Sequence, residues 1–231
     1  MKRLVIINGS PKKTNSASSK LAQEIIALLP ALDIHPMISA LQVCNGAKGS
    51  QQALEQALAD ADILLFIFPL YADGLPARLL QMMSLIPAAI SRARGPLTVY
   101  AMCNCGFYES AHTHLALRMV AHFCADKGFD WQGGIGIGGG EIIDANKPLC
   151  HSPTQHIYRA LRILVERINA GERNAEVLSL SVEPPMPRWV YRALGSLRWL
   201  VEARGNGVLL PLLTSLWRKP AGTIESRRSA D

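Results

Sequence analysis

The residues best suited to chemistry form a short polar loop near the start of the sequence. Residues 4–7 are apolar, and residues 8–16 are rich in hydroxyl, amide and glycine groups. Helical periodicity begins at residue 17, so the loop leads into a helix N-terminus, where unpaired N–H groups and the helix dipole attract an anion. Four side chains add neutral donors for a phosphate group: Ser10, Thr14, Asn15 and Ser16.

Two common phosphate-binding motifs are absent from this loop. No Gly-Lys-Ser/Thr triplet ends it, which excludes a Walker A sequence, and it lacks the G-x-G-x-x-G pattern of a dinucleotide fold. The loop therefore predicts a phosphate cradle built largely from side-chain hydroxyls.

A second candidate loop follows the apolar run at residues 62–68. Its prolines stiffen the backbone, and its glycine permits a close approach or a positive φ. The aromatic ring at position 71 suits one face of a planar ligand. The candidate binding residues here are Pro69, Leu70, Tyr71, Ala72 and Gly74.

A third candidate loop follows the apolar run at residues 97–103. A tight turn at residues 104–106 offers backbone N–H groups, and two aromatic residues after it add ring surface. The candidate binding residues here are Asn104, Cys105, Gly106, Phe107 and Tyr108.

Alternating strand and helix patterns position these loops. We expect strands at residues 4–7, 34–40, 62–68, 97–103 and 130–137, and helices at residues 17–29, 50–60, 75–86, 109–127 and 154–170. This alternation predicts an α/β fold with a five-stranded parallel sheet covered on both faces. Pro36 places the second strand at an edge, which favours the flavodoxin-like doubly wound order 2-1-3-4-5. In that order, the three loops lie together beyond the carboxyl ends of their strands.

The three loops resemble motifs of flavodoxin-fold NAD(P)H-dependent FMN reductases and of the related NAD(P)H:quinone oxidoreductases. Residues 9–16 look like the family's G-S-P-x-x-x-S/T-N-S/T signature, and residues 68–76 are similar to its P-x-Y-x-x-G-x-P segment. Residues 104–109 are similar to its isoalloxazine-contacting loop, and the resemblance covers residues 3 to about 170. Lys12 stands where the family has arginine, so the planar fork of a guanidinium is lost.

The resemblance implies a bound FMN and NADH or NADPH as electron donor. Residues 10–16 would hold the phosphate, residues 69–74 would line the ring and ribityl chain, and residues 104–108 would hold the pyrimidine side. Tyr71 and Tyr108 would contact the second substrate, with no catalytic side chain and no metal. The implied reaction passes electrons to a quinone, azo or nitroaromatic acceptor. The alternative is a flavodoxin-like electron carrier without its own reductase activity.

Composition narrows the class of protein. The 231 residues are 49% hydrophobic, and the five cysteines include no C-x-x-C pair, which fits a reducing cytoplasm and argues against a disulfide framework or structural zinc site. We find no signal peptide and no apolar stretch long enough for a membrane span. We therefore expect a cytoplasmic protein that acts on a small molecule and not on nucleic acid.

Three other patterns favour structural roles. Residues 134–139 match G-x-G-x-x-G by letter, but no apolar-periodic helix follows them, so we expect glycines that make room for a flavin or a neighbouring loop. His112 and His114 have a spacing that directs them to different sides of a helix. Cys103 and Cys105 are expected to be buried, unreactive thiols.

The end of the sequence predicts an appended segment. We expect a binding domain at residues 1–182, an amphipathic helical extension at 183–219 and a flexible tail at 220–231. Residues 186–231 carry 8 of the 24 basic residues and only 3 of the 18 acidic ones. The extension has an apolar stripe, which we expect to be buried in a protein interface, most simply a homodimer. Packing on the protein's own binding domain and contact with an anionic membrane surface are the alternatives.

Overall fold

The structure, a computed structural model, describes residues 2–12, 15–31, 37–42, 47–86, 95–171 and 176–208. Several predictions made from the sequence fall outside these ranges. They concern Thr14 as a phosphate ligand, Pro36 as the mark of an edge strand, the second half of the C-terminal extension, and the tail at residues 220–231.

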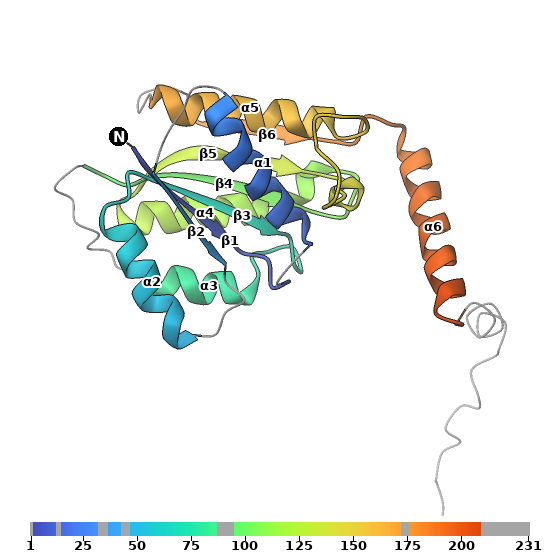
Figure 1. The fold of residues 1–231 in the computed structure, drawn as a ribbon, viewed down its shortest axis with the longest axis horizontal. Helices are drawn as coiled ribbons and strands as arrows, with labels where there is room; N and C mark the ends of the chain where they lie inside the picture. The colour runs from blue at the N-terminus through green and yellow to red at the C-terminus, as the bar shows by residue number, and fades with distance from the viewer. Residues whose placement is uncertain are drawn as a thin grey trace, which may run out of the picture. The chain divides into compact units, whose positions relative to one another are not determined.

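Six parallel strands form one sheet in the order β2-β1-β3-β4-β5-β6 (Figure 1). The strands are β1 (Arg3–Asn8), β2 (Met37–Gln42), β3 (Ile63–Pro69), β4 (Thr98–Asn104), β5 (Asp130–Ile137) and β6 (Leu178–Val182). The predicted flavodoxin-like order 2-1-3-4-5 is confirmed for the first five strands, and β2 lies at an edge. The predicted number of strands was one too few, because β6 extends the sheet beyond β5.

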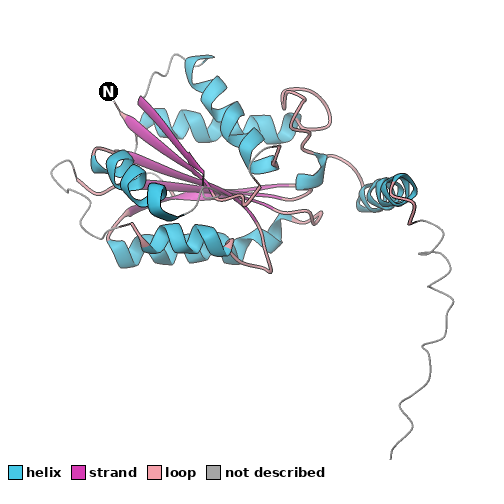
Figure 2. Cartoon of the chain, turned by 60° about the horizontal axis from the view of Figure 1, so that its bottom comes forward, coloured by secondary structure: helices cyan, strands magenta, loops and turns pink. Residues whose placement is uncertain are grey.

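Helices cover both faces of this sheet (Figure 2). They are α1 (Ala17–Ala31), α2 (Ala47–Ala59), α3 (Ala77–Ser84), α4 (His114–Lys127) and α5 (Gln155–Ala170), with short 3-10 turns η2 (Ser110–Thr113) and η3 (Gly140–Ile142). One core cluster joins the sheet to α1 and α5, and another joins it to α2, α3 and α4. The doubly wound arrangement is therefore as predicted.

Alternate residues of each central strand enter opposite cores. In β1, Leu4 and Ile6 pack in the core beneath α1 and α5, whereas Val5 and Ile7 pack in the other one. The same division holds along β3, where every residue from 63 to 68 is buried. Because both faces need apolar side chains, these strands are continuous apolar runs in the sequence.

The chain divides into two compact units, Met1–Pro185 and Met186–Asp231. The described part of the second unit is mainly α6 (Arg188–Gly205). No helix within the described residues combines the length and the apolar character needed to cross a membrane.

Candidate functional site

Three loops meet at the carboxyl end of the sheet. The backbone N–H of Gly9 donates to the carbonyl of Ile67 over 2.8 Å, which ties the loop after β1 to the end of β3. The N–H of Leu70 likewise donates to the carbonyl of Asn104 over 2.8 Å, so the loops after β3 and β4 lie side by side. The sequence placed all three loops at this edge, and these hydrogen bonds confirm that placement.

The loop after β1 presents hydroxyl groups at the start of α1. Ser10 and Ser16 are both buried, and Ser10 Oγ accepts the N–H of Lys12 over 3.3 Å. Asn15 is exposed at φ 54°, a left-handed conformation that turns the chain sharply before the helix. Gly9 is required at the start of the loop, because a Cβ there would lie 2.8 Å from Phe68 Cβ.

Ser16 caps α1 in addition to lining the loop. Its Oγ accepts the N–H of Ser19 over 3.0 Å, which is the usual N-cap interaction. Ser16 Oγ also lies 2.8 Å from Ser19 Oγ, and Ser19 Oγ accepts the side-chain amide of Asn8 over 2.9 Å. A chain of hydrogen bonds thus fixes the helix start against the end of β1.

Asn104, at the end of β4, connects the start of α1 and the end of β3 through its side chain. Its Nδ2 donates to Ser18 Oγ over 3.0 Å and to the carbonyl of Phe68 over 3.1 Å, and both Asn104 and Ser18 are buried. Both amide hydrogens are therefore engaged with protein atoms. Sequence reasoning proposed Asn104 as a ligand contact and overlooked Asn8, Ser18 and Ser19, because the partners of Asn104 lie far away in the chain.

Residues 71–74 form a tight turn after β3. Tyr71 and Gly74 exchange backbone hydrogen bonds of 3.0 and 2.9 Å. Between them, Ala72 has φ 45° and Asp73 has φ 58°, the pair of positive values that marks a type I′ turn. Tyr71, at the start of this turn, is 45% exposed. Tyr71, which was predicted to cover one face of a planar ligand, is therefore open to solvent and accessible to a ligand.

Replacing Ala72 by glycine is expected to raise the free energy of unfolding by about 0.5–1 kcal/mol. Alanine is strained at positive φ and glycine is not, although glycine also gains freedom in the unfolded chain. Chemical denaturation measures the change. The matched control is Ala27→Gly at an exposed position of α1, where the same substitution should destabilise by about 1 kcal/mol. A loss of stability at both positions would contradict the prediction.

The loop after β4 combines a buried thiol with an exposed ring. Cys105 Sγ lies 3.7 Å from the carbonyl oxygen of Phe107, and burial raises the pKa of this thiol, so it is protonated near neutral pH. Cys103 is also buried, and burial raises the pKa of its thiol well above the usual value. Both are free thiols, and the burial expected for them is confirmed. Their low reactivity stays a prediction. Phe107 is 56% exposed, and Tyr108 is half-buried.

The glycines at residues 134–140 make room for this loop. A Cβ on Gly136 would lie 2.2 Å from Thr113 Oγ1, and one on Gly138 would lie 2.2 Å from the carbonyl oxygen of Tyr108. A Cβ on Gly140 would lie 3.0 Å from the carbonyl oxygen of Cys105. The segment is β5 followed by the short turn η3, so its glycines serve the close approach of a neighbouring loop, as expected.

The two histidines near α4 have different partners. The His112 ring packs on Phe107 with centroids 4.5 Å apart, and its Nε2 lies 3.9 Å from a carboxylate oxygen of Glu109. His114 Nε2 instead lies 3.3 Å from Ser181 Oγ on β6. The prediction placed both on one helix. The structure instead places His112 in η2 and His114 at the first residue of α4, where they have different partners.

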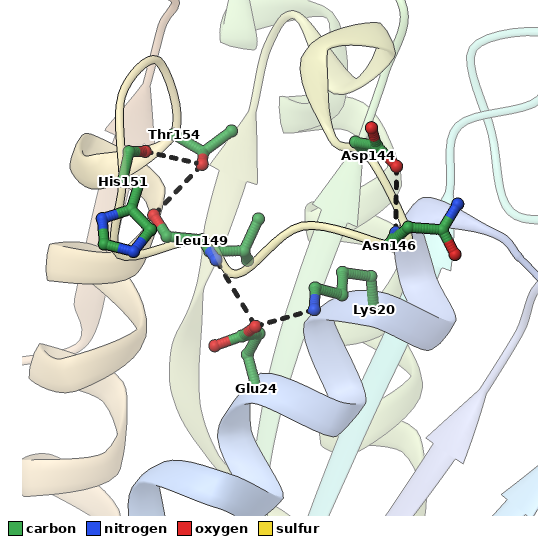
Figure 3. Close-up of polar contacts among 7 residues, drawn as sticks. All are labelled: Lys20, Glu24, Asp144, Asn146, Leu149, His151 and Thr154. Atoms are coloured by element: carbon green, nitrogen blue, oxygen red, sulfur yellow. Dashed lines mark hydrogen bonds and ion pairs between the residues drawn. The ribbon is translucent and has the colours of Figure 1, made fainter.

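The segment between β5 and α5 is attached to α1 by polar contacts (Figure 3). Lys20 and Glu24 form an ion pair of 2.9 Å, and Glu24 Oε1 accepts the backbone N–H of Leu149 over 3.4 Å. Thr154 Oγ1 lies 3.1 Å from the carbonyl oxygen of Leu149, just before α5 begins. These contacts hold α1, and with it the N-terminus that faces the first loop.

The donor set at the first loop fits a phosphate group. Buried serine hydroxyls lie at a helix N-terminus, and glycine at position 9 lets the backbone approach closely. Neutral hydroxyl donors together with a helix dipole stabilise an anion without a paired cation. Exposed rings on the two neighbouring loops add surface for a planar group.

Comparisons with known proteins agree with this geometry. A family model described as NADPH-dependent FMN reductase matches residues 1–126, more than half of the chain. An FMN-dependent NADH-azoreductase from Bacillus anthracis in complex with FMN is 14% identical, with a TM-score of 0.55 over 72% of this chain and 99% of that one. An NAD(P)H:quinone oxidoreductase from Methanothermobacter marburgensis is 14% identical, with a TM-score of 0.53 over 73% and 96%. No curated protein matches significantly. At such identities the structural matches support the fold alone.

Proposed function

Because this chain belongs to the NADPH-dependent FMN reductase family, we propose that it passes electrons from NADH or NADPH through bound FMN to a quinone, azo or nitroaromatic compound. The family makes it an FMN- and NAD(P)H-dependent oxidoreductase, and the acceptor is what the proposal adds. The observation that supports it is the exposure of Tyr71 and Phe107 on adjacent loops. Exposed rings at the end of the sheet favour a flat aromatic acceptor, which gains by stacking.

Each of the three loops would bind a different part of FMN or of the second substrate. Ser10, Asn15 and Ser16, with the α1 N-terminus, would hold the FMN phosphate. Bound FMN would supply the redox chemistry, accepting hydride from the nicotinamide and delivering electrons to the acceptor. The turn at residues 69–74 and the loop at residues 104–108 would flank the ring. Tyr71 and Tyr108 would orient the second substrate. Cys105, with its thiol buried, would contribute only backbone groups.

Assembly and compartment complete the proposal. Leu115 and Met119 of α4 and Leu80 of α3 are exposed, and Met119 Sδ lies 3.8 Å from where a Cβ on Gly74 would stand. Exposed apolar residues beside a binding loop favour a subunit contact, so we propose a homodimer. The four described cysteines are free thiols, which supports a reducing, cytoplasmic environment.

Flavin content and turnover test the function. The purified protein should show flavin absorbance, or gain it on addition of FMN, and should oxidise NADH or NADPH with a benzoquinone or an azo dye. Failure to bind FMN would overturn the proposal. Activity that requires a separate reductase protein would favour the electron-carrier alternative.

Replacing Ser10 by alanine is expected to raise the Kd for FMN by about tenfold or more, since one hydrogen bond to a charged phosphate is lost. The Kd for riboflavin, which has no phosphate, should stay within about threefold. Fluorescence titration measures both ligands. Ser84→Ala on the exposed face of α3 is the matched control and should leave both values unchanged. Equal weakening of FMN and riboflavin binding would contradict a phosphate contact by Ser10.

A further inference from the structure

Helix α6 carries an apolar face that is exposed along its whole length. No residue of the helix is buried, and Trp189 and Leu197 on this face are 72% and 58% exposed. Leu194, Leu200 and Val201 are exposed as well. Burying this many large apolar side chains is energetically favourable, so we expect the face to bind another molecule or surface.

Most apolar residues of α6 gather on one side of the helix, whereas Trp199 lies on the other side, between Arg188 and Arg192. With 3.6 residues per turn, they cover an arc of about 140°. The members of this arc are Trp189, Val190, Ala193, Leu194, Leu197, Leu200 and Val201. Arg188, Arg192 and Arg198 fall outside the arc, whereas Arg204 falls inside it in the last turn, where a long side chain can extend past the helix end.

The charge of α6 indicates which kind of surface its apolar face binds. The helix contains four arginines and one acidic residue, Glu202, which is already paired with Arg198 at 2.9 Å. A second copy of α6 would bring the same positive charge against this one and be repelled. An anionic lipid surface would attract it, and each basic residue near such a surface adds to binding.

We propose that α6 binds the surface of an anionic membrane, lying in the headgroup layer with its apolar face toward the acyl chains. The helix is 18 residues long, or about 27 Å, and combines a wide apolar face with arginines on the opposite side, which is the pattern of an interfacial helix. Trp189 stands at the border between the two faces, where an indole ring suits the membrane–water interface.

Vesicle binding by the full-length protein tests this inference. The protein should cosediment with vesicles of phosphatidylcholine containing about one third phosphatidylglycerol, at least about tenfold more strongly than with phosphatidylcholine alone. Raising the salt concentration to about 0.5 M should weaken binding, because it screens the arginines. The assay needs no flavin, donor or acceptor, so its failure would leave the proposed reductase function untouched.

Two substitutions with the same change of charge distinguish insertion of the apolar face into the membrane from electrostatic attraction alone. Leu197→Glu, at the centre of the apolar face, should weaken binding by about fiftyfold, because it loses both burial and charge. Gly195→Glu lies on the opposite face with nothing within 4 Å of its Cβ, and it should weaken binding by only about fivefold. Equal losses would overturn the proposal. Equal binding to vesicles with and without phosphatidylglycerol would also overturn it. A protein that binds no vesicles and forms a dimer that Leu197→Glu dissociates would overturn it as well.

Discussion

Replacing Gly138 by alanine is expected to lower the free energy of unfolding by more than about 3 kcal/mol and to abolish tight FMN binding. The added Cβ would lie 2.2 Å from the Tyr108 carbonyl oxygen and 2.9 Å from the Ser110 nitrogen. These are backbone atoms, so no side-chain rotation relieves the overlap. The loop at residues 105–110 would have to move away from the end of β5, and the proposed ring-binding wall would move with it.

Thermal unfolding and FMN titration measure the two effects of Gly138→Ala. Gly106→Ala in the same loop is the control for stability, because its Cβ would meet only Glu141 side-chain atoms at 3.5 Å or more. We expect that variant to unfold within about 1 kcal/mol of the unchanged protein. A Gly138→Ala protein that melts like the unchanged one would show that the loop can retreat without cost.

Elements with a strong local signal could be predicted from the sequence. The buried strand β3 is an uninterrupted apolar run, and β5 begins and ends at the residues expected for it, 130 and 137. Boundaries were less accurate where a proline intervenes. The third helix was expected from residue 75, but α3 starts at Ala77 because Pro76, with ψ 136°, occupies the N-cap position. The fourth helix was expected from residue 109, but its first turn is the 3-10 segment η2.

The sixth strand was missed for a physical reason. Residues 178–182 are few, and serines occupy their second and fourth positions, so only Leu178 and Val182 are buried. This alternation is typical of a strand with one solvent-exposed face. The strand is too short for the pattern to be recognised beside the continuous apolar runs of the central strands. Its place is set by pairing with β5, in the register Gly133 to Leu178, which the local sequence does not encode.

The candidate site was predictable as three loops but not as a network. Strand order alone brings the loops together, and the residue types within each suggest their chemistry. The bond from Asn104 to Ser18 joins residues 86 positions apart, and no spacing rule finds it. That long-range bond gives Asn104 a positioning role, which a substitution can separate from direct contact with the flavin.

Replacing Asn104 by alanine is expected to lower the free energy of unfolding by about 2–4 kcal/mol, because it leaves two buried acceptors, Ser18 Oγ and the Phe68 carbonyl, without their donor. Ser18→Ala should cost less, about 1 kcal/mol, since Asn104 keeps its bond to Phe68. Denaturation of both single variants and of the double variant gives their coupling. We expect the double variant to be about 1 kcal/mol more stable than the sum of the single losses.

FMN titration of the same variants distinguishes the two roles of Asn104. If its amide acts by holding the loop after β4 against the start of α1, Ser18→Ala should weaken FMN binding in the same direction as Asn104→Ala, and more weakly. Ser18 is buried and its hydroxyl is engaged by Asn104, so a shared effect on affinity has to pass through the loop. A different outcome would make Asn104 a direct flavin ligand. In that case Asn104→Ala would weaken FMN binding, Ser18→Ala would leave it unchanged, and the two substitutions would show no coupling in the free energy of unfolding.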